Sequence, residues 1–280
     1  MSELDPKLDR VAVVTGAGTG IGRAIASKFG TLGWRVAIGG RRIEPLAETT
    51  ALVEQAGGTC FAHPLDVTDP ESAERFFAAA EEKLGKVTVV INNAGAGRWG
   101  PLEDFSPAEI HAEIATKLTG SLYMARLGIQ SMRAQGGGGD ILFITSTSAV
   151  QPWPFHLPYA AANAGVEHAA RMLRLELEGS GIRVNVLRCG ETAGTEFAMK
   201  EMGQERMMKA HNFWFRRGLL RHSGLMTPDM VADAVVAAVT LPLGYQYELM
   251  AVVPTAPLGD LPVTYEDLIA SLMRHLPPSS

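Results

Sequence analysis

Cysteines are scarce in this sequence, and long apolar segments are missing. Only two of the 280 residues are cysteine, Cys60 and Cys189, and neither stands at the spacing of a zinc site or of a disulfide framework. We expect both to be buried, reduced thiols and no metal site to be present. No segment reaches the roughly eighteen apolar residues of a membrane-spanning helix, and the opening MSELDPKLDR is too polar for a signal peptide. The sequence therefore predicts a cytoplasmic protein without a membrane partner.

Positive charge is sparse as well. The chain has 25 lysines and arginines against 30 acidic residues, which gives a formal net charge of -5 at pH 7. The pairs Arg41-Arg42 and Arg216-Arg217 are isolated, so no basic stripe is present that would follow a phosphate backbone. A nucleic-acid partner is therefore not expected.

Short β-branched runs alternate with segments of helical period along the chain. The runs are RVAVVTG, RVAIGG, TCFAHPLD, KVTVVINN, DILFITS, RVNVLRCG and YELMAVV. Apolar strands separated by helices are typical of a parallel sheet that is buried on both faces. Helices are predicted over Ile21 to Leu32, Ile43 to Ala56, Pro70 to Leu84, Pro107 to Met132, Pro158 to Leu177 and Met230 to Leu241. The expected fold is α/β: one doubly wound (Rossmann) domain over residues 1–280, with a seven-stranded parallel sheet and helices on both faces.

A glycine-rich turn follows the first predicted strand. It reads VVTGAGTGIG and contains Gly16, Thr19, Gly20, Ile21 and Gly22. Glycines at these places let the backbone turn sharply and approach a pyrophosphate, whose charge is met by the N–H groups at the start of the next helix. A tight strand-to-helix turn that binds nothing is the alternative reading. The spacing favours a dinucleotide cofactor.

The end of the second strand indicates which dinucleotide is bound. An acidic residue at this point would hold a ribose 2′-hydroxyl and repel a 2′-phosphate. The sequence AIGGRR instead has Gly40 there, followed by Arg41 and Arg42, which can pair with a phosphate. NADP (NADPH) is therefore favoured over NAD. Two solvated arginines at a helix start are the alternative.

Several further motifs follow along the chain: LDVTD, INNAGAG, a serine in FITSTSAV thirteen residues before the tyrosine of PYAAANAG, and RVNVLRCG. Together with the glycine-rich turn, they resemble the short-chain dehydrogenase/reductase family over nearly the whole chain. The resemblance implies contacts to the adenine and the nicotinamide part of NADP at Asp66, Val67, Asn93, Ala94, Gly95, Gly190 and Thr192. The family's Pro-Gly after the sixth strand is here Cys189-Gly190, and the threonine expected soon after it is displaced to Thr192 or Thr195.

The resemblance also implies a Ser–Tyr–Lys–Asn catalytic tetrad, in which the lysine follows the tyrosine by four residues. Ser146 and Tyr159 match, but Asn163 stands at the lysine position and Lys117, in EIATKLTGS, at the asparagine position. The same exchange is found in ketoreductase domains of polyketide and fatty-acid synthases. We therefore expect Ser146, Tyr159, Lys117 and Asn163 to form the catalytic site, with Lys117 and Tyr159 also contacting the cofactor.

The exchanged positions of lysine and asparagine can also be explained physically, without reference to the family. A free tyrosine has a pKa near 10, and a positive charge about 5 Å away at an effective dielectric of ~20 lowers it by about 2 units. Asn163 carries no charge, so Lys117 is the expected source. The 3–4 spacing places Lys117 on one helix face with Ile110, Ile114 and Ser121, which predicts an inward side chain. A lysine that merely covers apolar surface is the alternative.

A variable substrate lid is expected around residues 194–227. Its apolar residues are Phe197, Met199, Met202, Met207, Met208, Phe213, Trp214 and Phe215. Flexible methionines and aromatics suit an adaptable apolar pocket, although the lid can equally pack this face on the core. Trp153, His156 and Arg98 are candidates for the pocket rim, with His156 expected to be exposed, and His211 receives no role.

These observations predict an NADPH-dependent carbonyl reductase (EC 1.1.1.-) that acts on a hydrophobic ketone or aldehyde of moderate size. Hydride would pass to the carbonyl carbon, Tyr159 would donate the proton, and Ser146 would hydrogen-bond the oxygen. Lys117 would lower the pKa of the phenol and hold the ribose, and Asn163 would orient the lysine or a water. The alternatives are an alcohol dehydrogenase working oxidatively and a catalytically silent NADP-binding sensor or scaffold. A homodimer or homotetramer is expected from the resemblance alone.

Overall fold

A computed structural model of the chain describes residues 10–195 and 203–275. Within them, a parallel sheet of seven strands has the order β3-β2-β1-β4-β5-β6-β7. The strands are β1 (Val11–Thr15), β2 (Arg35–Gly40), β3 (Thr59–Pro64), β4 (Val89–Asn92), β5 (Gly139–Ser146), β6 (Ile182–Cys189) and β7 (Met250–Val252). The strand order reverses between β1 and β4, which opens a crevice at the carboxyl ends of these strands. The doubly wound α/β fold is confirmed.

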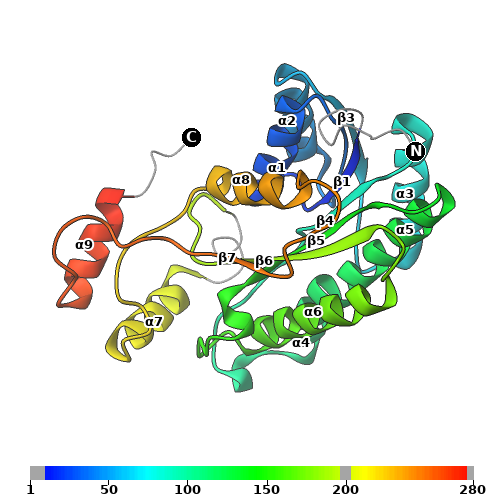
Figure 1. Cartoon of the computed structure of the whole chain (residues 1–280). Coiled ribbons are helices and arrows are strands. Elements are labelled where there is room, and N and C mark those ends of the chain that lie inside the picture. The colour runs from blue at the N-terminus through cyan, green and yellow to red at the C-terminus, as the bar shows by residue number, and fades with distance from the viewer. Residues whose placement is uncertain (1–9, 196–202, 276–280) are drawn as a thin grey trace.

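Helices cover both faces of the sheet (Figure 1). One face carries α1 (Gly20–Thr31), α2 (Ile43–Gln55) and α8 (Pro228–Val239), and the other carries α3 (Pro70–Leu84), α5 (Gly120–Ala134) and α6 (Leu157–Glu176). Successive residues of β1 point to opposite sides: Ala12 and Val14 lie in the first core, Val11 and Val13 in the second. Burial on both faces explains why the strands read as continuous apolar runs.

Local signals in the sequence explain where the helices begin. The side chain of Asp69 accepts a hydrogen bond from the Glu71 N–H at 3.0 Å and caps α3. Ser106 and Glu109 form a reciprocal capping box at the start of α4 (Pro107–Ile114). Five of the six predicted helices begin and end within about two residues of the expected positions.

The long helix expected from Pro107 to Met132 is not continuous. A π-helical turn, η2 (Ala115–Thr119), separates α4 from α5, and Lys117 lies at its centre. Such turns change the direction of the side chains around them and are frequent at functional sites. Lys117 is 3% exposed, as predicted, but Ile114 is 36% exposed, so the predicted apolar face is wrong there. Glu113 occupies the buried position one turn before the lysine.

The C-terminal part differs most from the expectation. Strand β7 has only three residues, and a helix that was not predicted, α9 (Tyr265–His275), lies beside α7 (Gly203–Arg216) beyond the end of the sheet (Figure 1). The Tyr265 hydroxyl donates to the Met208 carbonyl at 3.2 Å, which joins the two helices. Among the helices of the described ranges, none is both long and apolar enough to cross a bilayer.

A buried ion cluster joins the strands at the end of the sheet away from the crevice. Asp140, at the start of β5, is fully buried and accepts hydrogen bonds from Arg10 at 2.6 Å and from Arg183 at 2.8 and 2.9 Å. Asp140→Ala leaves both guanidinium groups without their carboxylate, and we expect it to lower the free energy of unfolding by about 3 kcal/mol. Urea denaturation measures this loss. The exposed Asp260→Ala serves as control, with an expected change within about 0.5 kcal/mol; equal midpoints for the two variants would contradict a stabilising role.

Candidate active site

The glycine-rich turn between β1 and α1 is built so tightly that it requires glycine. Gly16 and Gly20 have φ values of 64° and 55°, and a Cβ on Gly22 would lie 2.4 Å from the Gly16 carbonyl oxygen. Within the described part of the chain, the N-cap residue Thr19 makes no side-chain hydrogen bond to the first turn of α1. The first amide groups of this helix, including that of Ile21, therefore remain for an anionic ligand.

The loop after β4 holds this turn in place. The side-chain amide of Asn93 donates to the carbonyls of Thr15 at 2.9 Å and Gly16 at 3.2 Å, and the Ala94 N–H donates to the Thr15 hydroxyl at 2.9 Å. Gly95 in this loop lies against Lys117 of η2: a Cβ on Gly95 would be 3.4 Å from Cδ of Lys117. The predicted residues 93–95 thus lie between the glycine turn and Lys117.

Positive and negative side chains meet where β2 ends. Arg41 and Arg42 are exposed, and the charge of Arg41 acts on Asp66. Partial burial opposes ionisation of Asp66, but hydrogen bonds from the Thr68 N–H and hydroxyl, at 2.9 and 2.7 Å, and the arginine outweigh it and lower the pKa. Val67 is buried against the helix that follows η2. The structure therefore brings the expected adenine-side residues together.

The segment after β6 carries the two candidate threonines. The Gly190 N–H donates to the Val252 carbonyl at 2.8 Å, and the Thr192 hydroxyl donates to the Gly190 carbonyl at 3.1 Å. Thr195 instead lies against the glycine turn, 3.3 Å from the place that a Cβ of Gly20 would take. Of the two, Thr195 is the one that contacts the turn.

Tyr159 contacts two of the three other expected catalytic residues, Ser146 and Asn163. Ser146 ends β5, pairs in register with Cys189, and shares a hydrogen bond with the Tyr159 side chain from the first turn of α6. Asn163 is fully buried, donates to the Tyr159 carbonyl at 2.9 Å and to its phenol, and has a side-chain oxygen without a hydrogen-bond partner among the described residues. An unsatisfied buried oxygen of this kind suits a ligand, a water or an ammonium group.

The fourth residue, Lys117, points inward as predicted. Its Nζ donates to the Ile144 carbonyl at 2.5 Å, and burial lowers the pKa of the ammonium to about 8. Cys189 lies close enough to interact electrostatically with the lysine, and burial raises the pKa of the thiol to about 12. Lys117 is therefore mostly charged at neutral pH and Cys189 is a neutral thiol.

The pKa of Tyr159 is shifted in the direction opposite to the prediction. The pKa of the phenol is raised to about 12, chiefly by loss of water around it; Cys189 and Glu113 act in the same direction, and hydrogen bonds with Ser146 and Asn163 act against it. The free energy lost when the phenolate is removed from water exceeds the stabilisation that those hydrogen bonds provide. The phenol is consequently held in its protonated form at neutral pH.

The sequence patterns did not predict most of the aromatic side chains around Tyr159. His156 is 7% exposed rather than solvated, and its ring stacks on Tyr159 with centroids 4.6 Å apart. Burial lowers its pKa to about 3, so the ring is neutral at pH 7. The edge of His156 meets Trp99, whose centroid lies 5.4 Å away. The one available signal was the position of the histidine, three residues before the tyrosine.

Helix α7 completes this aromatic wall. Its Trp214 and His211 lie 5.2 and 5.1 Å from Trp99, and the Trp214 indole donates to the Pro154 carbonyl at 2.9 Å. In the predicted lid, Phe213 and Met207 pack around the same cluster, Met208 is 44% exposed, and the Phe215 ring lies tilted against Tyr265 of α9. Trp153, a candidate for the pocket rim, packs on the same cluster. The lid residues Phe197, Met199 and Met202 lie outside the described residues. The lid therefore does pack an apolar face on the protein.

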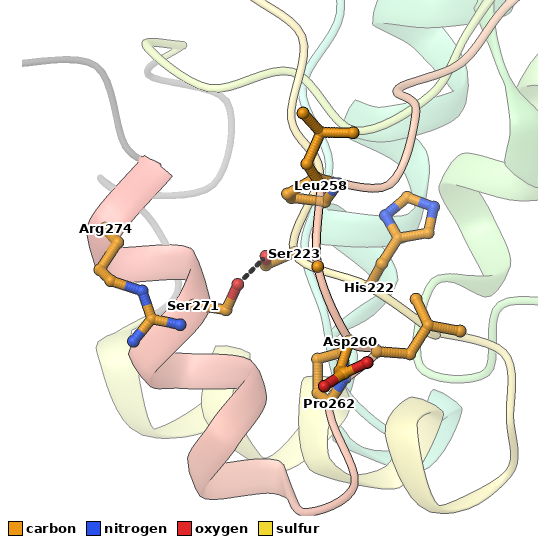
Figure 2. Close-up of a pocket in the computed structure, with 10 residues that line it drawn as sticks. His222, Ser223, Leu258, Asp260, Pro262, Ser271 and Arg274 are labelled. Atoms are coloured by element: carbon orange, nitrogen blue, oxygen red, sulfur yellow. Dashed lines mark hydrogen bonds between the residues drawn. The ribbon is translucent and has the colours of Figure 1, made fainter.

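Two cavities lie outside the predicted catalytic residues. One, of about 460 Å³, is lined by α7 and by residues 100–104. The other, of about 400 Å³, lies between the loop after Pro257 and α9, where Figure 2 shows Ser223 bonded to Ser271 at 2.6 Å. None of its lining residues is a predicted catalytic or cofactor-binding residue, although His222 and Ser223 lie in the predicted lid. Within the described ranges, no group of three or more His, Cys, Asp or Glu side chains is arranged as a metal site.

Several known proteins are similar to this chain in sequence. D-threitol dehydrogenase of Mycolicibacterium smegmatis is 34% identical over 190 residues, which are 66% of this chain and 71% of that protein. Sulfoacetaldehyde reductase 2 of Chromohalobacter salexigens is 29% identical over 248 residues, 88% of this chain and 94% of that protein. An uncharacterized oxidoreductase of Caenorhabditis elegans is 37% identical over 184 residues, 65% of this chain and 58% of the relative, so less than two thirds of that relative is spanned.

Solved structures show the same architecture. An alcohol dehydrogenase from the archaeon Thermococcus sibiricus, complexed with 5-hydroxy-NADP, aligns with a TM-score of 0.74 and 29% identity over 88% of this chain and 96% of that chain. A metagenomic short-chain oxidoreductase in complex with NADP aligns with a TM-score of 0.73 and 29% identity over 91% and 100%. The family model for short chain dehydrogenase matches residues 10–206, which hold the glycine turn and all four expected catalytic positions. The chain is thus an oxidoreductase that belongs to the short-chain dehydrogenase family.

Proposed function

We propose that the protein is an NADPH-dependent carbonyl reductase for a hydrophobic ketone or aldehyde of moderate size. The observation that carries this proposal is the meeting of Ser146, Tyr159 and Asn163 at the carboxyl end of the sheet. Lys117 is buried nearby, in contact with Ile144 of the same strand as Ser146. The family membership supports redox chemistry at this place.

The residues of the crevice fit a dinucleotide phosphate. The glycine turn leaves no room for a Cβ at Gly22, and Thr19 does not cap α1 within the described chain, which suits a pyrophosphate at this helix end. Arg41 and Arg42 are exposed beside Asp66 and would hold a 2′-phosphate. When bound, NADPH supplies the hydride. Two similar proteins of known structure are bound to NADP or 5-hydroxy-NADP, which supports this choice.

Ser146 and Tyr159 would act on the carbonyl oxygen. The hydroxyl of Ser146 would donate a hydrogen bond to it, and the phenol of Tyr159 would transfer its proton as the carbon is reduced. A pKa raised to about 12 keeps the phenol protonated at neutral pH, which is the state that a proton donor requires. Oxidation of an alcohol requires the phenolate instead, so this electrostatic environment favours reduction.

Lys117 and Asn163 would support the proton transfer from exchanged positions. The ammonium of Lys117 would stabilise the phenolate that remains after the proton has left and would hold the ribose hydroxyls. The side-chain oxygen of Asn163, which has no hydrogen-bond partner within the described ranges, would accept a hydrogen bond from that ammonium or from a water. The family's usual lysine is thereby replaced by a cation from the α4–α5 segment.

An alcohol dehydrogenase working oxidatively is the first alternative, and the names of the similar proteins include both dehydrogenases and a reductase. A silent NADP-binding sensor or scaffold is the second. Against it stands the contact of Ser146 with Tyr159, which a protein that only binds the cofactor does not need. A homodimer or homotetramer remains part of the proposal.

The test is NADPH consumption with a panel of ketones, aldehydes and β-keto thioesters, run in parallel with NADH. We expect turnover of at least one apolar carbonyl compound and a preference for NADPH of about tenfold or more, because one or two arginine–phosphate contacts contribute at least that factor. Oxidation of the matching alcohols with NADP⁺ measures the first alternative. Tight NADPH binding without turnover of any panel member would favour the silent protein.

A further inference from the structure

A buried carboxylate that the proposed mechanism does not use joins α6 to two strands. Glu167, on α6, is 4% exposed. Its carboxylate accepts a hydrogen bond from the Thr145 hydroxyl of β5 at 2.9 Å and a bidentate pair from the Arg188 guanidinium of β6 at 2.9 and 2.6 Å. Hydrogen bonds of this fork type fix both the distance and the orientation of the two groups. One side chain thus sets how α6 lies on the ends of β5 and β6.

The two strand residues that bind Glu167 directly precede the site. Thr145 and Arg188 are partners in the parallel register, and the next pair along the strands is Ser146 and Cys189. Side chains alternate between the faces of a sheet, so Thr145 and Arg188 both point toward α6. The carboxylate therefore holds the last register pair before Ser146.

The helix side of this contact is continuous with Tyr159. Tyr159, Asn163 and Glu167 follow one another at intervals of four residues, which places them along one face of α6. The Asn163 side chain donates to the Tyr159 carbonyl at 2.9 Å, and the Tyr159 side chain shares a hydrogen bond with Ser146. The contact of Ser146 with Tyr159 spans β5 and α6. Its length consequently depends on how these two elements are held together.

Packing alone does not require polar groups at this place. The preceding residues on the same face of the strands are apolar and belong to the core beneath α6: Ile141 and Phe143 on β5, and Val184 and Val186 on β6. Apolar side chains of similar volume often replace a buried ion pair without loss of stability, because desolvation of the charges is costly. Apolar contacts, however, do not fix orientation as a carboxylate–guanidinium fork does.

We infer that Glu167 is a positioning residue: by binding Thr145 and Arg188 it holds α6 against the end of β5, so that Tyr159 stays within hydrogen-bonding reach of Ser146. Its consequence for catalysis rests on the proposed function. There, the two hydroxyl groups must reach the same carbonyl oxygen, and a productive arrangement tolerates displacements of only about 0.5 Å. Glu167 itself takes no part in the proton transfer.

Glu167→Gln keeps the shape of the side chain but presents an NH2 group to one of its donors. We expect kcat for carbonyl reduction to fall by about 30-fold, because misplacement by about 1 Å can cost up to about 100-fold. The KM for the carbonyl substrate and the affinity for NADPH should stay within about threefold of wild type. Steady-state kinetics and NADPH titration measure these values.

Thr145 offers a conservative pair of substitutions that leaves the ion pair in place. Thr145→Val removes only the hydroxyl that reaches Glu167, and kcat should fall by about tenfold. Thr145→Ser retains the hydroxyl and should keep kcat within about twofold of wild type. A serine variant as slow as the valine variant would overturn the inference, since the hydrogen bond would then not be what matters.

Asp140→Asn is the matched control for Glu167→Gln. It converts another buried carboxylate, also held by arginines, to an amide at the opposite end of β5. We expect both variants to be less stable to urea, but only Glu167→Gln to lose kcat when both are assayed at a temperature where circular dichroism shows them folded. Equal losses of kcat in the two variants would overturn the inference, because destabilisation alone would then explain them.

A measurement without turnover distinguishes this inference from the proposed function. Crystal structures of wild type, Glu167→Gln and Asp140→Asn give the distance between the hydroxyl oxygens of Ser146 and Tyr159. We expect it to lengthen by about 0.5 Å or more in Glu167→Gln and to stay unchanged in Asp140→Asn. This result supports the inference even if no panel substrate is reduced, in which case the proposed function alone fails.

The same distance decides against the inference if it does not change. An unaltered separation of Ser146 and Tyr159 in Glu167→Gln would refute the positioning role. If Glu167→Gln does not fold, the nearly isosteric Thr145→Val provides the same measurement, with the same expected lengthening and the same contrary result.

Discussion

Tyr159→Phe is expected to lower kcat for carbonyl reduction by about 1,000-fold or more. The substitution removes only the hydroxyl, so the ring still stacks on His156 and the backbone still accepts from Asn163. General acid catalysis contributes about 100- to 10,000-fold, and the loss of its donor removes this factor. Because the ring and its contacts remain, KM should change by less than about threefold. Steady-state consumption of NADPH with the best panel substrate measures both values.

Tyr245→Phe is the control for this variant, because it deletes the same hydroxyl from a residue that is 56% exposed. It should leave kcat unchanged. If Tyr159→Phe kept more than about a tenth of the wild-type rate, another group would have to donate the proton, and His156, whose ring lies 4.6 Å from that of Tyr159, would be the next to replace. Unchanged NADPH affinity in Tyr159→Phe would confirm that the crevice is intact.

Lys117→Met is expected to lower kcat by about 100-fold or more, since it removes the charge that stabilises the tyrosinate while filling the same buried space. The pH profile gives a second readout. Burial lowers the pKa of Lys117 to about 8, so the lysine is charged below that pH and loses its proton as the pH rises through it. Wild-type reduction should therefore decline above about pH 8, and this decline should be missing in Lys117→Met. Tyr159, with a pKa of about 12, stays protonated across the same range.

Lys28→Met controls for the loss of a lysine, because Lys28 forms a surface ion pair with Asp233 at 2.8 Å. It should retain wild-type kcat and the decline above pH 8. Near-normal activity of Lys117→Met would refute the exchange of lysine and asparagine. Adding Asn163→Lys to Lys117→Met restores the family's usual order only in part, and we expect it not to rescue kcat completely.

Much of the fold and the cofactor side of the site was predictable because the signals are local. The alternation of apolar strands with helices predicted the parallel sheet, and caps such as Asp69 and Ser106 mark helix starts within a few residues of sequence. The glycine turn could be recognised because steric exclusion at Gly22 arises from Gly16, six residues away. The inward direction of Lys117 followed from helical spacing and is confirmed.

Other features depend on contacts between distant segments and had no local signal. The π turn at Lys117 moved Ile114 to the surface, and the burial of Glu113 depends on α6 and on the Arg98 loop. His156 became buried because Trp99 and α7 close over it. Helix α9 was missed as well, since its docking partner is α7.

The sequence by itself determined the layered α/β fold, the glycine-rich turn and the identity of the residues proposed for proton transfer. Only the tertiary structure decided their protonation. A tyrosine, a histidine and a lysine have ordinary pKa values in an extended chain, and here burial raises that of Tyr159 to about 12 and lowers those of His156 and Lys117 to about 3 and 8. Desolvation depends on everything packed around a group, whereas spacing along the chain depends on the sequence alone.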